Sequence, residues 1–202
     1  MTDPAGREII WRRIMDDLSF EHAQLHRTAA GPELRGVVLI AESGAPMRIE
    51  YRVSCDAAWQ TRSVDVEQAY QGERRILRLT HDGAGRWTVG GQPAPDLDGC
   101  TDVDLGVSPS TNALPVNRLR LPIGGAHVIR AAWVRFPTLQ IVAAQQSYER
   151  TAETRYHYRS LTSGFEALVD VDADGLPTEY AGIWRRIAEG PALTPGPAPT
   201  LS

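Results

Sequence analysis

Alternation of apolar and polar side chains over short segments is the feature that most limits how this chain folds. Between Met47 and Cys55 every second residue is apolar, and the residues between them are charged or hydroxylated. This period of two is typical of a strand with one buried face. Segments that read as further strands are bounded by Gly, Pro or Asp, which are common in turns. They are 34–40, 59–66, 75–80, 86–89, 126–136, 139–148, 154–160, 165–171 and 178–184.

Short strands without intervening helices indicate a mainly β fold. They predict a large antiparallel sheet that is curled or closed on itself. The segment 108–119 differs, because hydroxyl and amide side chains there precede apolar ones. Thr111 or Asn112 in a capping position, with Pro115 in the first turn, predicts a single helix near residues 111–120.

The length of 202 residues fits one domain. Residues 189–202 contain four prolines among small side chains. Such a segment cannot bury enough apolar surface to offset its loss of conformational entropy. We therefore expect a single domain over residues 1–188 and a disordered Pro/Ala-rich tail over 189–202.

All 21 basic residues are arginines, and the absence of lysine excludes several kinds of chemistry. A Schiff base needs a lysine amine, and the phosphate-binding P-loop ends on a lysine. The formal charge is −4 and the arginines are dispersed. Affinity for nucleic acid comes mainly from clustered basic charge, so we expect no nucleic-acid partner.

The compartment is predicted from the first seventeen residues and the cysteines. The N-terminal segment is charged throughout, with no apolar stretch of signal-peptide length. No window approaches the ~18 consecutive apolar residues of a membrane helix. Cys55 and Cys100 lie far apart in the sequence, and we interpret both as reduced thiols. We expect a cytoplasmic protein without an integral membrane segment.

Two segments resemble metal-binding motifs, and both have a simpler interpretation. Residues 170–175 open like a calcium loop, but Ala181 occupies the place of the bidentate Glu. A hairpin turn with Gly175 at positive φ explains the same residues. His22 and His26 have the spacing of a zinc pair on a helix, but on a strand they lie too far apart to share an ion. We expect no metal.

Asp102 and Asp104 are the best candidates for catalysis. On a strand both carboxylates point to the same side, about 7 Å apart, within the range of an inverting glycosidase pair. A polar sheet face paired with arginines is the commoner origin of such a pair. The chain has no Gly-x-Ser-x-Gly elbow and no dinucleotide fingerprint. We therefore expect a protein that is not an enzyme and has no cofactor.

Aromatic residues lie on many of the expected strands. In a curled sheet some of these rings face inward, where they fill the interior or line a ligand cavity. Rings that carry a polar group suit ligands that are apolar on one side and hydrogen-bonding on the other. They are Trp11, Trp59, Trp87, Trp133, Trp184, Tyr51, Tyr148, Tyr156 and Tyr158.

Several blocks of sequence occur in the order of a known family. The most specific is Gly-Cys-Thr-Asp-Val-Asp-Leu-Gly at 99–106, which leads into Ser-Pro-Ser-Thr-Asn-Ala-Leu-Pro-Val-Asn-Arg-Leu at 108–119. The other blocks are 18–21, 51–56, 59–62, 85–87, 133–137, 145–148, 156–158 and 171–176. Together, over residues 8–187, they resemble the family described as putative glycolipid-binding proteins.

The resemblance implies a spiral β-roll, in which many strands wrap around a single helix and enclose a tunnel-like pocket. It implies a shape similar to the half-barrel lipoprotein carriers of the outer-membrane sorting pathway. It also implies a homodimer.

The leading hypothesis is non-catalytic binding of an amphiphilic small molecule, a glycolipid or a similar lipid-like molecule, inside the roll. Aromatic rings would line its apolar part, and charged or amide groups would hold its head group, since buried charges need partners. The candidate ligand-binding residues are Tyr51, Trp59, Arg62, Trp87, Asp102, Asp104, Asn112, Arg118, Tyr148 and Tyr158.

Three alternatives stay open. In a purely structural account, Arg62 and Arg118 pair with Asp102 and Asp104 to pin the helix to the sheet. In an enzymatic account, the two aspartates act on a sugar or lipid head group. In the third, the outer face of the sheet is a protein-interaction module, and the interior is filled.

Overall fold

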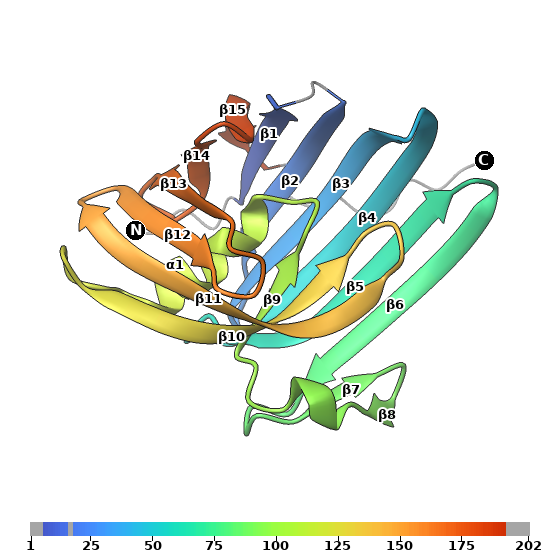
Figure 1. The fold of residues 1–202 in the computed structure, drawn as a ribbon, viewed down its shortest axis with the longest axis horizontal. Coiled ribbons are helices and arrows are strands. Elements are labelled where there is room, and N and C mark those ends of the chain that lie inside the picture. Colours follow the sequence, from blue (N-terminus) through green and yellow to red (C-terminus); the bar gives the residue numbers. More distant parts are fainter. Residues whose placement is uncertain (1–5, 16–17, 193–202) are drawn as a thin grey trace.

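A single sheet of fifteen strands forms most of the protein (Figure 1). The computed structural model describes residues 6–15 and 18–192. Its strands are β1 (Arg7–Arg13), β2 (Ser19–Arg27), β3 (Pro32–Glu42), β4 (Ala45–Cys55), β5 (Thr61–Tyr70), β6 (Glu73–His81), β7 (Trp87–Val89), β8 (Gln92–Pro93), β9 (Asp102–Leu105), β10 (Ala126–Arg135), β11 (Gln140–Ala152), β12 (Arg155–Ser160), β13 (Glu166–Val171), β14 (Pro177–Tyr180) and β15 (Trp184–Pro191). The prediction of a mainly β, curled fold is confirmed.

The order of strands follows the chain except at one place. It runs from β8 back to β1, and then from β15 back to β9, so the first and last strands pair with each other. The sheet curls until its two parts face one another without closing (Figure 1). All pairs are antiparallel except β9 and β10. The expected antiparallel sheet therefore has one parallel pair, because a helical crossover separates these two strands.

That crossover contains the one α-helix of the described residues. A 3₁₀ turn, η2 (Ser110–Asn112), leads directly into α1 (Ala113–Leu119). A second 3₁₀ turn, η1 (Pro95–Leu97), precedes β9. The helix lies between the two facing parts of the sheet (Figure 1). No helix among the described residues is long and apolar enough to cross a membrane.

The helix begins differently from the expected capped start at Thr111 or Asn112. Neither side chain caps it, since η2 continues straight into α1. The Thr111 hydroxyl accepts a hydrogen bond from the Leu105 amide, and the Asn112 amide group donates to the Pro109 carbonyl. Pro115 lies in the first turn, as predicted.

The alternating pattern places one face of each long strand in the core. On β4 the side chains from Met47 to Cys55 alternate between buried and more exposed positions, as the sequence predicts. The core also includes the apolar face of α1, from Ala113 to Val116. The interior is therefore built from inward faces on both parts of the sheet and from the helix between them.

The C-terminal strand continues past the expected end of the fold at residue 188. β15 runs to Pro191, which pairs with Arg7, and the Ala192 amide bonds to the Gly6 carbonyl. Strand β1 supplies backbone partners that a proline-rich segment lacks by itself. The rest of the expected tail, 193–202, lies outside the described residues.

Candidate functional site

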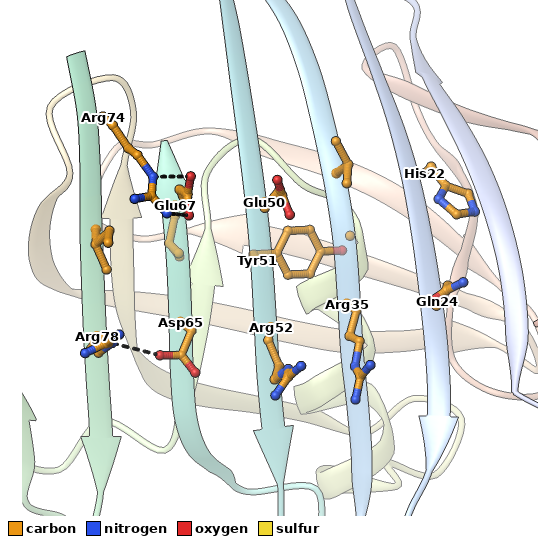
Figure 2. A pocket seen from close by; sticks show the side chains of 14 residues that line it. His22, Gln24, Arg35, Glu50, Tyr51, Arg52, Asp65, Glu67, Arg74 and Arg78 are labelled. Atoms are coloured by element: carbon orange, nitrogen blue, oxygen red, sulfur yellow. Dashed lines mark hydrogen bonds and ion pairs between the residues drawn. The ribbon is translucent and has the colours of Figure 1, made fainter. Parts of the chain in front are cut away.

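One hollow, of about 560 Å³, lies on the outer face of β2–β6. Figure 2 shows the charged side chains over it, several of them in cross-strand pairs. Arg74 bonds to Glu67, and Arg78 approaches Asp65 at 3.5 Å. Paired, exposed charges of this kind are typical of a solvated sheet face.

A second hollow, of about 1,100 Å³, lies at the ends of the same strands. Leu18, Phe20 and Leu39 line it and are 45–53% exposed. The arginines in its lining, Arg48 and Arg74, are already paired with glutamates. It offers apolar contact but no buried polar group that would orient a ligand.

A third hollow, of about 340 Å³, reaches from the exposed Met15 and Phe165 inward to the buried Leu105 and Ala144, and we call it the interior cavity. It combines aromatic and polar side chains from β1, β9, β10, β11, β12, β14, β15 and the segment around η2. Its lining is Arg13, Met15, Asp104, Leu105, Gly106, Ser108, Asn112, Trp133, Ala144, Gln146, Tyr158, Ser160, Ser163, Phe165, Tyr180, Ile183 and Trp184.

The aromatic part of the interior cavity is a packed cluster of rings. The ring centre of Tyr158 lies 5.9 Å from that of Tyr180 and 6.2 Å from that of Phe165. Tyr148 packs against the other side of Tyr158, at 5.3 Å. Ring pairs at these separations are favourable, so the rings stabilise one another. Tyr158, Phe165 and Tyr180 line the cavity, and we call them the aromatic wall.

The polar part of the interior cavity is centred on Asp104 of β9. The amide of Gln146 donates to the Asp104 carboxylate at 2.5 Å. Burial raises the pKa of Asp104 to about 6. Beside it, Asn112 accepts a hydrogen bond of 3.0 Å from the hydroxyl of Tyr148. A carboxylate and an amide thus lie next to the aromatic wall.

A buried hydrogen-bond network adjoins the cavity through Ser108. One carboxylate oxygen of Glu21, Oε1, accepts hydrogen bonds from Tyr51 at 2.5 Å and from Ser108 at 2.7 Å. Ser110 joins the network through Tyr51, at 2.7 Å. The other oxygen, Oε2, is buried and has no hydrogen-bond partner within residues 6–15 and 18–192. Burial raises the pKa of Glu21 to about 7.

Arg118 faces Asp102 rather than the cavity. Its guanidinium contacts both carboxylate oxygens, at 2.5 and 3.0 Å, and also bonds to Thr101 at 3.0 Å. Asp102 is almost fully buried. This ion pair fastens α1 to β9, as the structural alternative predicts for Arg118. Arg62 takes no part in it, because it pairs with Asp56 at 2.7 Å.

The remaining predicted site residues divide into two groups. Asp104, Asn112 and Tyr158 line the interior cavity, and Asp102 and Tyr148 border a small void next to it.

Four others are absent from the lining of the interior cavity: Tyr51, Trp59, Arg62 and Trp87. The Trp87 indole donates to the Cys100 carbonyl at 2.9 Å, and Trp59 lies in the turn before β5 with φ of 65°.

Several cavity residues were not predicted. Glu21 adjoins the cavity through Ser108, and Gln146 and Tyr180 line it. The sequence pattern around Glu21 indicates that its side chain is buried, because Glu21 lies two residues from the apolar Ala23 on the same face of β2. The others have no local signal, because their positions depend on how the sheet curls.

The residues that resemble metal motifs have structural roles. Asp172 accepts hydrogen bonds from the amides of Asp174 and Leu176 in the turn before β14, where Gly175 has φ of 74°. The two aspartates also contact Arg7, at 2.8 and 2.7 Å. The hairpin-turn interpretation explains this segment.

The two histidines lie on the extended strand β2, as the simpler interpretation requires. His26 contacts Gln24 at 3.1 Å, and His22 approaches Glu8 at 3.7 Å. Among the described residues no group of three metal-binding side chains was found.

The fold and the cavity define the class: a mainly β protein whose curled, unclosed sheet surrounds a cavity next to a short helix. A model of the family described as "Putative glycolipid-binding" matches residues 8–186. The chain belongs to this family.

The comparison with solved structures gives two similar chains. A DUF1089 family protein from Pseudomonas aeruginosa is 33% identical, with a TM-score of 0.79 over 84% of this chain and 92% of that chain. A β-barrel-like protein of the DUF1849 family from Brucella abortus is 7% identical, with a TM-score of 0.49 over 96% of this chain and 100% of that chain. No curated protein matches the sequence.

Proposed function

We propose that the protein binds an amphiphilic molecule in the interior cavity without transforming it. The observation that carries the proposal is that aromatic rings and buried polar groups share one cavity of about 340 Å³. Ligand pockets are typically about 300–1,000 Å³, mostly apolar, with a few polar groups that orient the ligand. An alkyl or acyl segment would contact the rings, and the head group would lie toward Asp104.

Family membership supports the class of ligand. The description of the family names a glycolipid, which has an apolar chain and a polar head. Both parts have a counterpart in the lining, with Tyr158 and Tyr180 on one side and Asp104 and Asn112 on the other. A glycolipid or a similar lipid-like molecule is therefore the proposed ligand.

The enzymatic alternative is less well supported by the two aspartates. A glycosidase of the inverting type needs two carboxyl groups that both reach the substrate. Asp102 uses both oxygens to hold Arg118, so Asp104 alone faces the cavity. The geometry favours binding. A cytoplasmic location and a homodimer stay predictions.

The test is a titration with octyl glucoside, a simple amphiphile, below its critical micelle concentration. Trp133 and Trp184 line the cavity, so their fluorescence reports binding. Ala144 also lines it and is buried. We expect saturable binding that weakens by about tenfold or more in Ala144→Leu, which fills the cavity; tenfold corresponds to about 1.4 kcal/mol.

The matched control is Ala188→Leu, the same change at an exposed strand position outside the cavity. It should bind octyl glucoside as the unmodified protein does. Absence of saturable binding, or equal binding by the two variants, would contradict the proposed function.

A further inference from the structure

We propose that the interior cavity selects an amphiphile whose head group carries a positively charged amine, and that Asp104 is the residue that selects it. This inference rests on the proposed function, because it names the class of head group that the same cavity takes.

The first step is the state of the Asp104 carboxylate. Within the described part of the chain it accepts one hydrogen bond, from Gln146. It keeps some accessible surface because it lines the cavity. No ion pair engages it among these residues, since Arg118 is paired with Asp102. A carboxylate that takes part in no ion pair among the described residues therefore faces a cavity lined by aromatic rings.

The second step is the free energy needed to hold the Asp104 charge away from water. Removing a carboxylate from water without a counter-charge is unfavourable, and the group responds by holding its proton more tightly. Burial raises the pKa of Asp104 for this reason. An ammonium group in the cavity would supply the missing positive charge together with a charge-assisted hydrogen bond. A sugar hydroxyl would donate a hydrogen bond but would leave the charge uncompensated.

The third step is the aromatic wall. The π faces of aromatic rings attract cations, most strongly where water is excluded. Tyr158 and Tyr180 share the cavity with Asp104, whereas the ring of Trp133 already has the guanidinium of Arg135 over it, at 5.3 Å. Burial is the main reason that the pKa of Tyr158 is raised, and the negative charge of Asp104 raises it further. Next to Asp104 and these rings, an amine is therefore favoured over a phosphate or a sulfate.

Other charged or titratable groups surround Asp104 on each neighbouring element. Tyr148, Tyr158 and Tyr180 face it, and burial raises their pKa values, so they stay neutral. Further groups around it are the Asp102–Arg118 pair, Arg135 over the ring of Trp133, and Glu21 behind Ser108. Arg13 also lines the cavity, and its positive charge opposes a cation, so the selection depends on direct contact of the amine with Asp104. Glu21 is also acidic, so it adds to the preference for a cation when it is ionised.

The experiment compares three probes with the same chain: octylamine, octyl glucoside and octyl sulfate, each below its critical micelle concentration. At about pH 8 the Asp104 carboxyl is ionised and octylamine is protonated. We expect octylamine to bind about tenfold more tightly than octyl glucoside, and octyl sulfate to bind most weakly. The comparison in the unmodified protein tests the proposal without any variant.

Asp104→Asn keeps the shape of the side chain and removes its charge. It should weaken octylamine binding by about tenfold and octyl glucoside binding clearly less, because the asparagine oxygen still accepts a hydrogen bond from a sugar hydroxyl. The control is Asp65→Asn, which removes one negative charge on the outer face. This variant should bind all three probes as the unmodified protein does.

The pH dependence adds a second measurement. Lowering the pH from about 8 to about 5 protonates Asp104, while octylamine stays charged. Octylamine binding should therefore weaken as the pH falls through about 6, and octyl glucoside binding should change little. In Asp104→Asn this pH effect should be strongly reduced.

The outcomes separate the two proposals. If octyl glucoside or octyl sulfate binds as tightly as octylamine, or if Asp104→Asn folds and binds octylamine normally, the selection of an amine is overturned while the proposed function stands. If none of the three probes shows saturable binding, the proposed function fails together with it.

Discussion

Gly36 shows how a single residue gives the interior its hydrogen-bond network. It pairs across the sheet with Tyr51, and a Cβ at position 36 would lie 2.5 Å from the phenol ring. The absence of a side chain lets the ring lie over β3 and reach Glu21 on β2. The requirement is for space, since a positive φ is not found at Gly36.

Replacing Gly36 by Ala should lower the free energy of unfolding by about 1–3 kcal/mol, the usual cost of forcing extra atoms into a packed site. Urea unfolding measures the change. Gly190→Ala is the matched control, because Gly190 also lies in a strand and nothing lies within 4 Å of its Cβ position. Equal stability of the two variants would show that the ring has room to move.

At the scale of the element, α1 depends on its contacts. A helix of seven residues is far below the ~12–15 residues at which isolated helices become marginally stable. Two side chains fasten it: Arg118 bonds to Asp102 on β9, and the Asn117 amide donates to the Asp174 carbonyl at 2.8 Å. The helix therefore forms because the sheet holds it.

Arg118→Ala should destabilise the protein by about 3–5 kcal/mol without any ligand, because it leaves the buried Asp102 carboxylate unpaired. Chemical unfolding at neutral pH measures the loss. Arg185→Ala, which removes an exposed pair with Glu179, should cost less than about 1 kcal/mol.

The double variant Arg118→Ala, Asp102→Ala should recover part of the loss, since no charge is then left unpaired. A loss below about 1 kcal/mol in Arg118→Ala would instead indicate that the pair does not stabilise the fold.

At the scale of the whole molecule, buried carboxyl groups set the pH dependence of stability. Burial raises the pKa of Glu21 to about 7 and that of Asp104 to about 6. Because the folded state binds these protons more tightly than the unfolded state, stability rises as the pH falls through these values. Asp174 has the opposite effect: burial would raise its pKa, but Arg7 and Arg27 lower it overall. The stability that ionised Asp174 contributes is therefore lost only when the pH falls below the range in which Glu21 and Asp104 titrate.

The free energy of unfolding should therefore increase between about pH 8 and about pH 5, and Glu21 should supply about 2–3 kcal/mol of the increase. In Glu21→Gln the increase should be smaller by that amount. Urea unfolding at several pH values measures it. The control is Glu67→Gln. The hydrogen bond from Arg74 lowers the pKa of Glu67, so this variant should show the same increase between about pH 8 and about pH 5 as the unmodified protein. A Glu21→Gln slope equal to that of the unmodified protein would contradict the assignment.

Much of the fold could be predicted from the sequence. The segment 47–55 is a strand with the predicted buried face, and α1 begins two residues after the expected start of the helix at 111. One error is at a boundary: the segment 178–184, expected to be one strand, contains the turn between β14 and β15, where Gly182 has φ of 76°. Strands β1 and β2 were not predicted, because their buried positions include a tryptophan and a glutamate among many charged residues.

The sequence by itself determined which side of each regular strand is buried, because the period of two is a local property of the backbone. It also determined the family, through blocks that include Asp102 and Asp104. Only the tertiary structure decided which inward groups meet. Glu21 and Ser108 are 87 residues apart, yet they are hydrogen-bonded. Arg118 and Asp102 form a pair while Arg62 lies elsewhere. Such contacts depend on how far the sheet curls and where the crossover returns, and no local pattern of side chains encodes these.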